Sequence, residues 1–259
     1  MKSIKNKILA ILSGNSSSLS IDNNTFYKKF PIKLKVELVN KRIIISHLNE
    51  YAYFRISKAA NSTVVSSLYY GETSHEIRSL HYLQKIKDEY YDRPSDLSRD
   101  QVSKLLNSYF KFTFVRNPYT RILSAYLDKI VNNEAEKREL VAIHLGKSKG
   151  SEVSFDDFLL YLESGGIDEN GHWARQIDLI PIPLNKMDFI GRVENLQKDL
   201  DFTLSKIYNS CKPIISVREH STSTSLLIKE LAPETINRIY KLYESDFDSF
   251  HYPRKIFGS

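Results

Sequence analysis

Two stretches of this chain place a cation and several hydroxyl groups where an apolar strand passes into a helix. They cover residues 53–63 and 112–124. Each begins with buried-type, β-prone residues and continues through a polar turn into apolar residues at helical spacing. The first N–H groups of a helix and the positive end of its dipole attract anions, and a Lys or Arg at the turn adds a full charge. Two such turns predict a ligand with two separated phosphate groups.

The second stretch gives the more specific pattern. Asn117 is a favourable N-cap and Pro118 suits the first helical position, so the helix is expected to start there. Helical spacing then gives one polar face with Asn117, Arg121, Ser124 and Asp128. A guanidinium that binds two oxygens and a hydroxyl that donates a third bond form a good pair for one phosphate. We therefore expect Arg116 and Ser124 to reach the same anion.

In the first stretch, Lys58 begins the turn and a short polar run follows it. Backbone N–H groups of residues 60–63 can cradle a phosphate, and the hydroxyls of Ser62 and Thr63 can complete the cradle. The predicted anion-binding residues here are Lys58, Ala59, Ala60, Asn61, Ser62 and Thr63. Taken alone, this pattern fits a capped helix beside a solvated lysine better than it fits a ligand site.

The two turns together, in this order, resemble those of sulfotransferases that use 3′-phosphoadenosine 5′-phosphosulfate. Residues 58–63 resemble the loop for the 5′-phosphosulfate, and residues 114–126 resemble the motif for the 3′-phosphate. The likeness is greatest to Golgi carbohydrate sulfotransferases of the chondroitin and dermatan type and to their bacterial relatives. Three later segments are similar to the same family, so the resemblance extends over roughly residues 51–252. These segments are residues 172–176, 188–196 and 239–252.

The resemblance implies an α/β fold with a central parallel sheet flanked by helices, of the P-loop-like sulfotransferase type. It also implies that Lys58 is the catalytic cation at the leaving phosphate, that the donor is a co-substrate needing no metal, and that a glycan hydroxyl is the acceptor. The chain departs from the family in two places. Ser57 stands where a Pro is usual and Ala60 where a Gly is frequent. Because Ala does not readily adopt a positive φ, the shape of the turn stays open.

A histidine is attractive as the base for the acceptor proton, because its pKa lies near working pH. His172 lies in a family-like segment that follows a glycine-rich loop, and it is the first candidate. The ordinary alternative is that His172 and Trp173 pack this loop onto the sheet. His75 and His81, between the two turns, are the other candidates, since some relatives place their base upstream of the Arg motif.

Three further charged residues allow either a ligand contact or a structural role. Arg218 can meet the nucleotide or the acceptor, and a solvated loop explains it equally well. Arg192 and Glu194 belong to the site or support it. Glu194 precedes an expected helix, where a carboxylate is favourable for the helix dipole, and this favours a supporting role.

The composition favours anionic ligands without specifying one. The chain has 259 residues, 37 Lys and Arg against 31 Asp and Glu, and a formal charge of +6, and its pI is near 9.1. Cys211 is the single cysteine, so no disulfide can form within the chain, and the Cys and His spacing is not that of a zinc site. No apolar stretch is long enough to span a bilayer, and residues 8–12 are too few for a signal peptide. These features, and the absence of the Golgi anchor, predict a cytoplasmic enzyme of bacterial origin.

Residues 1–24 are polar and Ser-rich and are predicted to be a flexible segment, with residues 25–259 forming one catalytic domain. Strands alternating with helices favour a parallel sheet with ligands at the carboxyl ends of its strands. A hairpin or paired strands are expected over residues 32–46 and a strand over 187–193. Helices are expected over residues 80–91, 98–108, 154–164, 195–208 and 233–250, and from Pro118 as far as about residue 139.

These observations predict an enzyme that moves a sulfuryl group from 3′-phosphoadenosine 5′-phosphosulfate to a hydroxyl, on a sugar by family likeness. We expect neither nucleic acid nor a membrane as its partner. One alternative is a nucleotide phosphotransferase, although the chain has no G-x-x-x-x-G-K-[ST] motif and neither turn contains a glycine. The other is a noncatalytic RNA-binding module, which the basic, Tyr-rich composition allows but no RNP-like or KH-like signature supports.

Overall fold

A mixed four-stranded sheet forms the centre of the protein. The computed structural model describes residues 24–77, 79–132, 135–210, 212–215 and 228–254. The strand order is β1 (Ile43–Ser46), β2 (Tyr51–Phe54), β3 (Phe110–Val115) and β4 (Phe189–Arg192). β1 pairs antiparallel with β2, whereas β2, β3 and β4 run parallel to one another. The predicted α/β class is confirmed, with one antiparallel strand at the sheet edge.

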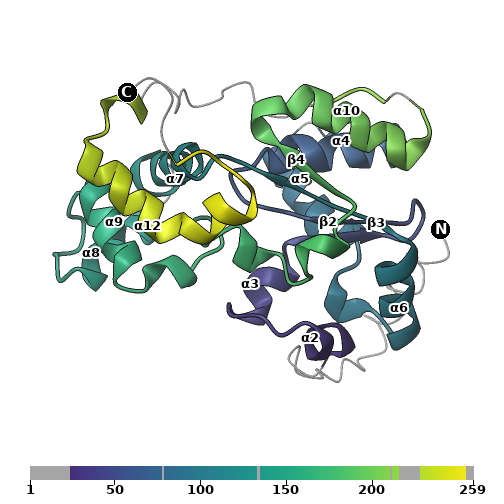
Figure 1. The fold of residues 1–259 in the computed structure, drawn as a ribbon, viewed down its shortest axis with the longest axis horizontal. Coiled ribbons are helices and arrows are strands. Elements are labelled where there is room, and N and C mark those ends of the chain that lie inside the picture. The colour runs from purple at the N-terminus through teal and green to yellow at the C-terminus, as the bar shows by residue number, and fades with distance from the viewer. Residues whose placement is uncertain (1–23, 78, 133–134, 211, 216–227, 255–259) are drawn as a thin grey trace.

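Helices surround this sheet on both faces and beyond its strand ends (Figure 1). They are α2 (Thr25–Lys29), α3 (Val36–Asn40), α4 (Asn61–Thr73), α5 (Leu80–Lys85), α6 (Arg99–Ser108), α7 (Pro118–Tyr126), α8 (Ala135–His144), α9 (Phe155–Glu163), α10 (Leu196–Tyr208) and α12 (Pro233–Ser249). Two π-helical turns, Ile86–Tyr90 and Leu127–Asn132, continue α5 and α7. Short 3-10 turns are Pro94–Asp96, Gly166–Asp168, Ile177–Leu179, Leu184–Lys186, Val193–Asn195 and Ile228–Glu230.

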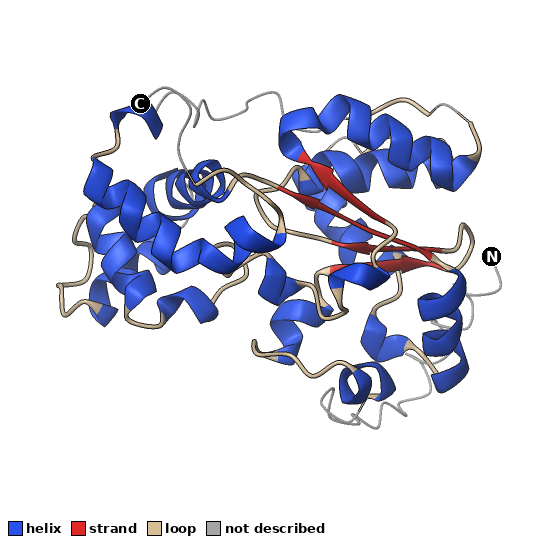
Figure 2. Ribbon diagram, in the orientation of Figure 1, coloured by secondary structure: helices blue, strands red, loops and turns tan. Residues whose placement is uncertain are grey.

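The alternation of side chains along β2 sends apolar groups into two separate cores. Tyr51 and Tyr53 point to the face covered by α4, α5 and α10, whereas Ala52 and Phe54 belong to the core on the other face. Figure 2 shows α4, α5 and α10 together on one side of the strands. The Tyr53 ring stacks on Phe112 of β3 with centroids 4.9 Å apart. Both faces being covered, β2 is buried throughout, as is usual for a parallel strand.

Most of the elements agree with the sequence. The helices predicted from residues 98, 154, 195 and 233 are confirmed within one residue at each start, and Ser98 and Ser154 form capping boxes. The helix from Pro118 passes into a π-helical turn before α8. The segment predicted to be flexible, residues 1–24, lies outside the described residues except for Asn24, which caps α2 and so already belongs to the fold.

The expected hairpin over residues 32–46 is wrong. Only Ile43–Ser46 is a strand, and its partner is β2, while Val36–Asn40 forms a short helix. The apolar residues Val36 and Val39 are three positions apart, a spacing that puts both on one side of a helix turn but on opposite faces of a strand. Val39 is fully buried in the core and Val36 packs partly against it.

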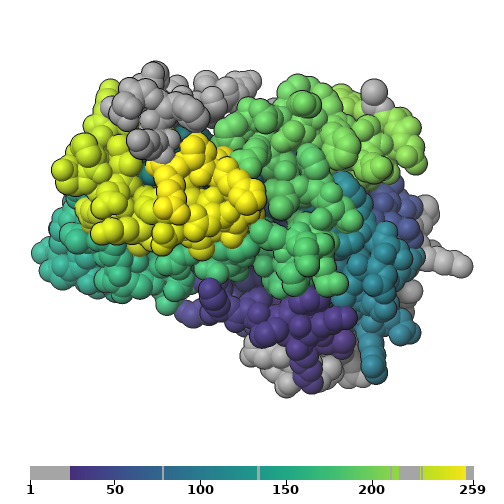
Figure 3. All heavy atoms as spheres, viewed as in Figure 1, coloured from purple at the N-terminus to yellow at the C-terminus, as the bar shows by residue number. Residues whose placement is uncertain are grey.

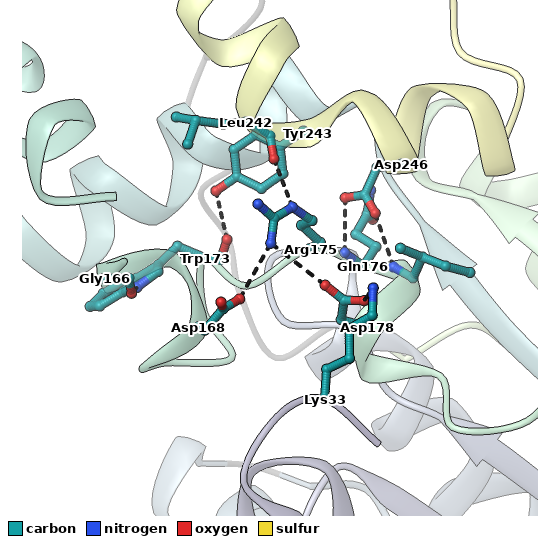
Figure 4. Close-up of polar contacts among 11 residues, drawn as sticks. Lys33, Gly166, Asp168, Trp173, Arg175, Gln176, Asp178, Leu242, Tyr243 and Asp246 are labelled. Atoms are coloured by element: carbon teal, nitrogen blue, oxygen red, sulfur yellow. Dashed lines mark hydrogen bonds and ion pairs between the residues drawn. The ribbon is translucent and has the colours of Figure 1, made fainter. Parts of the chain in front are cut away.

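The C-terminal helix fixes a long loop through one buried carboxylate (Figure 4). Asp246 of α12 is fully buried and accepts hydrogen bonds from the N–H groups of Gln176, at 2.8 Å, and Ile177, at 2.9 Å. The Tyr243 hydroxyl donates to the Trp173 carbonyl at 2.6 Å. Arg175 donates to the Leu242 carbonyl at 2.9 Å. The loop that carries residues 172–176 is therefore held by α12.

The end of the described chain closes over β4. In Figure 3 the yellow C-terminal residues lie against the green segment that contains β4 and α10. Arg192 donates to the Phe250 carbonyl, and its guanidinium lies 4.5 Å from the ring centroid of Tyr252. Among the helices of the described residues, none combines the length and apolar character needed to cross a bilayer.

Replacement of Asp246 by Ala is expected to lower the free energy of unfolding by about 2–4 kcal/mol, because two buried N–H groups lose their acceptor. Asp248→Ala, on the same helix, is the matched control. The Asp248 side chain is 58% exposed and pairs with Arg254 on the surface, so its loss is expected to cost less than about 0.5 kcal/mol. Urea unfolding followed by circular dichroism measures both variants. Equal midpoints would contradict the role given to Asp246.

Candidate active site

A cavity of about 680 Å³ lies at the carboxyl ends of β2 and β3, where the two predicted turns come together. Eight of the ten predicted site residues line it: Lys58, Ala60, Asn61, Ser62, Thr63, Arg116, Ser124 and His172. Ala59 is fully buried and does not line the cavity. Arg218 lies outside the described residues. The strand ends thus bring the two turns together, and the loop that carries His172 joins them.

The first turn reaches its shape without glycine. Lys58 has φ 66° and Ala60 has φ 53°, both in the left-handed region that costs an L-residue roughly 1–2 kcal/mol. Ala60, whose ability to adopt this conformation the sequence left open, is the N-cap of α4 and offers no side chain to the N–H groups of the first turn. Those N–H groups have no acceptor within the helix. The start of α4 is therefore strained and has no side-chain cap, which are properties of an anion-binding turn.

The second turn contacts the first through Arg116. Its Nη1 donates to the Lys58 carbonyl at 3.3 Å, and its Nε donates to the Thr120 hydroxyl at 3.0 Å. The Gln176 amide holds the backbone of Arg116 on both sides, accepting from its N–H and donating to its carbonyl at 2.9 Å each. Burial lowers the pKa of Arg116, and Glu194 opposes this shift. The guanidinium is thus fixed at the cavity wall.

Lys58 is held by a carboxylate in the same cavity. Its Nζ lies 3.0 Å from Asp128, which also pairs with Lys129 at 3.2 Å. Burial disfavours the charged form of Asp128, but the two lysines outweigh burial and lower the pKa of that carboxyl below its ordinary value. The Lys58 side chain is only 9% exposed. A solvated lysine beside a capped helix, which the first turn alone would fit, is therefore not what the structure shows.

Two π-helical turns deliver neighbouring charges to this cavity. Leu127–Asn132 contributes Asp128 and Lys129, and Ile86–Tyr90 contributes Lys87 and Asp88. In an α-helix, adjacent residues point about 100° apart, whereas the wider π turn changes this spacing locally. Such turns are rare and occur often at functional sites. Both of them here mark the same cavity.

His172 lines the cavity from the loop that α12 anchors. Burial is the main cause that lowers its pKa to about 2, and Lys129, Arg42, Lys137 and Lys58 add to the shift. Its Nδ1 is buried and has no hydrogen-bond partner. The imidazole is therefore neutral over the whole working pH range, which a proton acceptor requires, although its basicity is lower than the sequence suggested.

The other two candidate histidines lie elsewhere. His75 is exposed and its Nδ1 contacts the Thr73 carbonyl at 2.7 Å, at the end of α4 opposite to the cavity. His81 is exposed on α5 and does not line the cavity.

Glu194 and Arg192 support the site rather than line it. Glu194 accepts from the Asn117 N–H at 2.7 Å and from the Tyr252 hydroxyl at 3.0 Å. It therefore ties the start of α7 to the C-terminal segment, while Arg192 fixes that segment through Phe250.

Sequence reasoning missed five cations of the cavity wall. They are Lys41, Arg42, Arg55, Lys87 and Lys129. Arg55 ends the strand that leads into the first turn, and this position was a usable signal. The others come from elements whose meeting point follows only from the tertiary structure. Among the described residues, no group of three or more His, Cys, Asp or Glu side chains is placed to hold a metal ion.

Comparisons with known proteins agree with this geometry. A model of the sulfotransferase family matches residues 41–253. Carbohydrate sulfotransferase 10 of Danio rerio is 27% identical over 197 residues, which are 64% of this chain and 53% of that protein. Carbohydrate sulfotransferase 14 of Danio rerio is 30% identical over 188 residues, 61% of this chain and 48% of that protein. The chain thus spans about half the length of these relatives.

No solved structure gives a significant match. The relatives named above are vertebrate proteins, and so is carbohydrate sulfotransferase 10 of Gallus gallus, which is 28% identical over 184 residues, 62% of this chain and 51% of that protein. This finding counts against the expected bacterial origin. The family match covers both anion turns, the His172 loop and the closing helix, so this chain belongs to the sulfotransferase family.

Proposed function

We propose that this enzyme transfers a sulfuryl group from 3′-phosphoadenosine 5′-phosphosulfate to a carbohydrate hydroxyl. One observation carries the proposal: a single cavity contains the uncapped start of α4 with Lys58 and also Arg116 with Ser124. Two cationic turns in one cavity suit a nucleotide with two separated phosphate groups. The names of the relatives, carbohydrate sulfotransferases, support a sugar as the acceptor. Family membership argues against the phosphotransferase and RNA-binding alternatives.

In this proposal each turn binds one end of the donor. The start of α4 and Lys58 bind the 5′-phosphosulfate, and Arg116 and Ser124 bind the 3′-phosphate. The acceptor oxygen forms a bond to sulfur while the bond from sulfur to the 5′-phosphate oxygen breaks. Lys58 stabilises the charge that develops on the leaving phosphate, and His172 takes the proton of the acceptor hydroxyl. Asp128 holds the Lys58 ammonium at the cavity wall before the donor arrives.

Adenosine 3′,5′-bisphosphate is expected to bind in the presence of a chelator, because the two cationic turns supply the positive charge. Arg116→Ala is expected to weaken this binding by about 2–5 kcal/mol, as truncation of a buried charged partner does. Arg238→Ala is the control, since Arg238 pairs with Glu163 at the surface of α12 and does not line the cavity. Isothermal titration calorimetry measures both. If Arg116→Ala binds the bisphosphate as tightly as the wild type does, the second turn does not bind the 3′-phosphate.

Lys58→Ala is expected to lower kcat about 10²- to 10³-fold, the usual cost of one group that stabilises transition-state charge. The affinity for adenosine 3′,5′-bisphosphate is expected to fall less, because the charge on the leaving phosphate is greatest in the transition state. Lys104→Ala provides the control, since Lys104 is exposed on α6 and pairs with Glu50. Initial rates of labelled sulfuryl transfer give kcat. A Lys58→Ala enzyme with normal turnover would rule out this mechanism.

His172→Asn is expected to keep bisphosphate affinity but to lose about 10²- to 10⁴-fold in rate, as removal of a general base does. A protonated imidazole cannot act as the base. Because the pKa of His172 is lowered, the resulting loss of activity is expected only in more acidic solution than for an ordinary histidine. In the wild-type enzyme, kcat/KM for the donor is therefore expected to stay level on the acid side where an ordinary histidine titrates. Rates measured across pH test this. Normal turnover of His172→Asn would remove it from the chemistry.

A further inference from the structure

Three cations of the cavity wall have no part in the two donor turns. Lys41 and Arg42 lie between α3 and β1, and Arg55 follows β2. The Arg55 N–H donates to the Arg42 carbonyl at 2.8 Å, which continues the pairing of β1 with β2 by one step. The antiparallel edge strand thus brings the three side chains to one wall of the cavity.

The two arginines of this group are buried without a carboxylate partner. Arg42 is 7% exposed and Arg55 is 6% exposed. Arg42 donates to the Leu38 carbonyl at 2.6 Å and to the Ser57 hydroxyl at 3.4 Å. Arg55 donates to the Lys41 carbonyl through Nη2, while its buried Nε has no partner. In the described part of the chain, no carboxylate forms an ion pair with Lys41, Arg42 or Arg55.

Other buried cations of this protein are compensated. Lys58 pairs with Asp128 at 3.0 Å, and Arg121 lies in the field of Asp246. Burial of an unpaired charge costs several kcal/mol. Burial lowers the pKa of both Arg42 and Arg55. The neighbouring Arg55 and Arg121 add to this shift at Arg42, whereas Tyr53 and Asp88 partly oppose it at Arg55. The group therefore has an excess of positive charge that an external anion can balance.

The position of Arg42 places this excess charge near His172. A Cβ added to Gly171 would come within 2.3 Å of the Arg42 Cζ, so the guanidinium packs directly against the backbone of the residue before His172. Arg42 also reaches the Ser57 hydroxyl, one residue before Lys58. The three cations thus adjoin the reacting end of the cavity, where the acceptor must enter.

We propose that Lys41, Arg42 and Arg55 form a third anion subsite, which binds an oxyanion carried by the acceptor beside the hydroxyl to be sulfated. The proposal rests on the sulfotransferase function inferred above. Two guanidinium groups suit a carboxylate and a sulfate ester alike, because both offer paired oxygens for bidentate hydrogen bonds. The Lys41 ammonium adds a point charge at the more exposed side of the subsite.

Three oligosaccharide probes separate the two sources of the oxyanion. They are a tetrasaccharide of alternating glucuronate and N-acetylhexosamine, its carboxyl-reduced form, and the reduced form carrying one sulfate ester. Each is titrated by calorimetry into protein saturated with adenosine 3′,5′-bisphosphate, which fills the donor turns. At least one anionic probe is expected to bind about 10-fold or more tightly than the neutral probe, the effect of one well-formed charged contact. Equal affinities of the three probes, undetectable binding included, would overturn the subsite.

Variants assign the effect to these residues. Arg55→Gln and Lys41→Glu are each expected to remove the preference for the anionic probe while bisphosphate affinity and the donor KM change less than about 3-fold. Lys41 is exposed, so Lys41→Glu keeps the test valid if Arg55→Gln does not fold. Lys33→Glu, at a side chain 85% exposed that does not line the cavity, is the charge-matched control. If the donor KM of these variants rises as much as the probe Kd, the cations bind the donor, and the proposal is contradicted. Loss of bisphosphate binding in the wild type would instead refute the proposed function.

Discussion

The Gln176 amide is the contact on which the site geometry depends. It pairs with both backbone groups of Arg116, and the N–H of Gln176 is itself held by the buried carboxylate of Asp246. One side chain therefore links the end of β3, the loop of His172 and the helix α12. Because each of these groups is buried, leaving any one unpaired would cost free energy that only a shift of the whole loop could recover. The C-terminal helix thus sets the position of Arg116, the residue that follows β3.

Stability has been given up around the cavity in favour of ligand binding. Lys58 and Ala60 adopt left-handed backbone conformations where glycine would be free of strain, and seven Lys and Arg side chains line the wall against two Asp. Both features destabilise the protein, and a bound anion would offset them. Strain and like charges at the same place, in a fold otherwise consistent with its sequence, are what a functional site is expected to show.

The sequence predicted the helices and turns well because their signals are local. Ser98, Asn117 and Ser154 are N-caps whose side chains bond the next turn, and the structure contains all three. The short helix Val36–Asn40 was missed because five residues carry too little periodicity to separate helix from strand. The pairing of Lys58 with Asp128, and the meeting of Arg42 with the Gly171 backbone, depend on tertiary contacts that no spacing in the sequence encodes. The sequence could therefore propose the donor turns but not the remaining wall.

The four cations around His172 also affect the free energy of ligand binding. Burial is the main cause that keeps the imidazole neutral, and these cations add to it. A negative group that binds beside His172 would cancel part of their field and so raise the proton affinity of the imidazole. By thermodynamic linkage the effect is reciprocal: a substrate that strengthens proton binding is itself bound more tightly as the solution becomes more acidic. The basicity of the acceptor-facing group is thus a property of the loaded complex. Without a bound anion the imidazole is a weak base, and its basicity would grow with the negative charge of the ligands beside it.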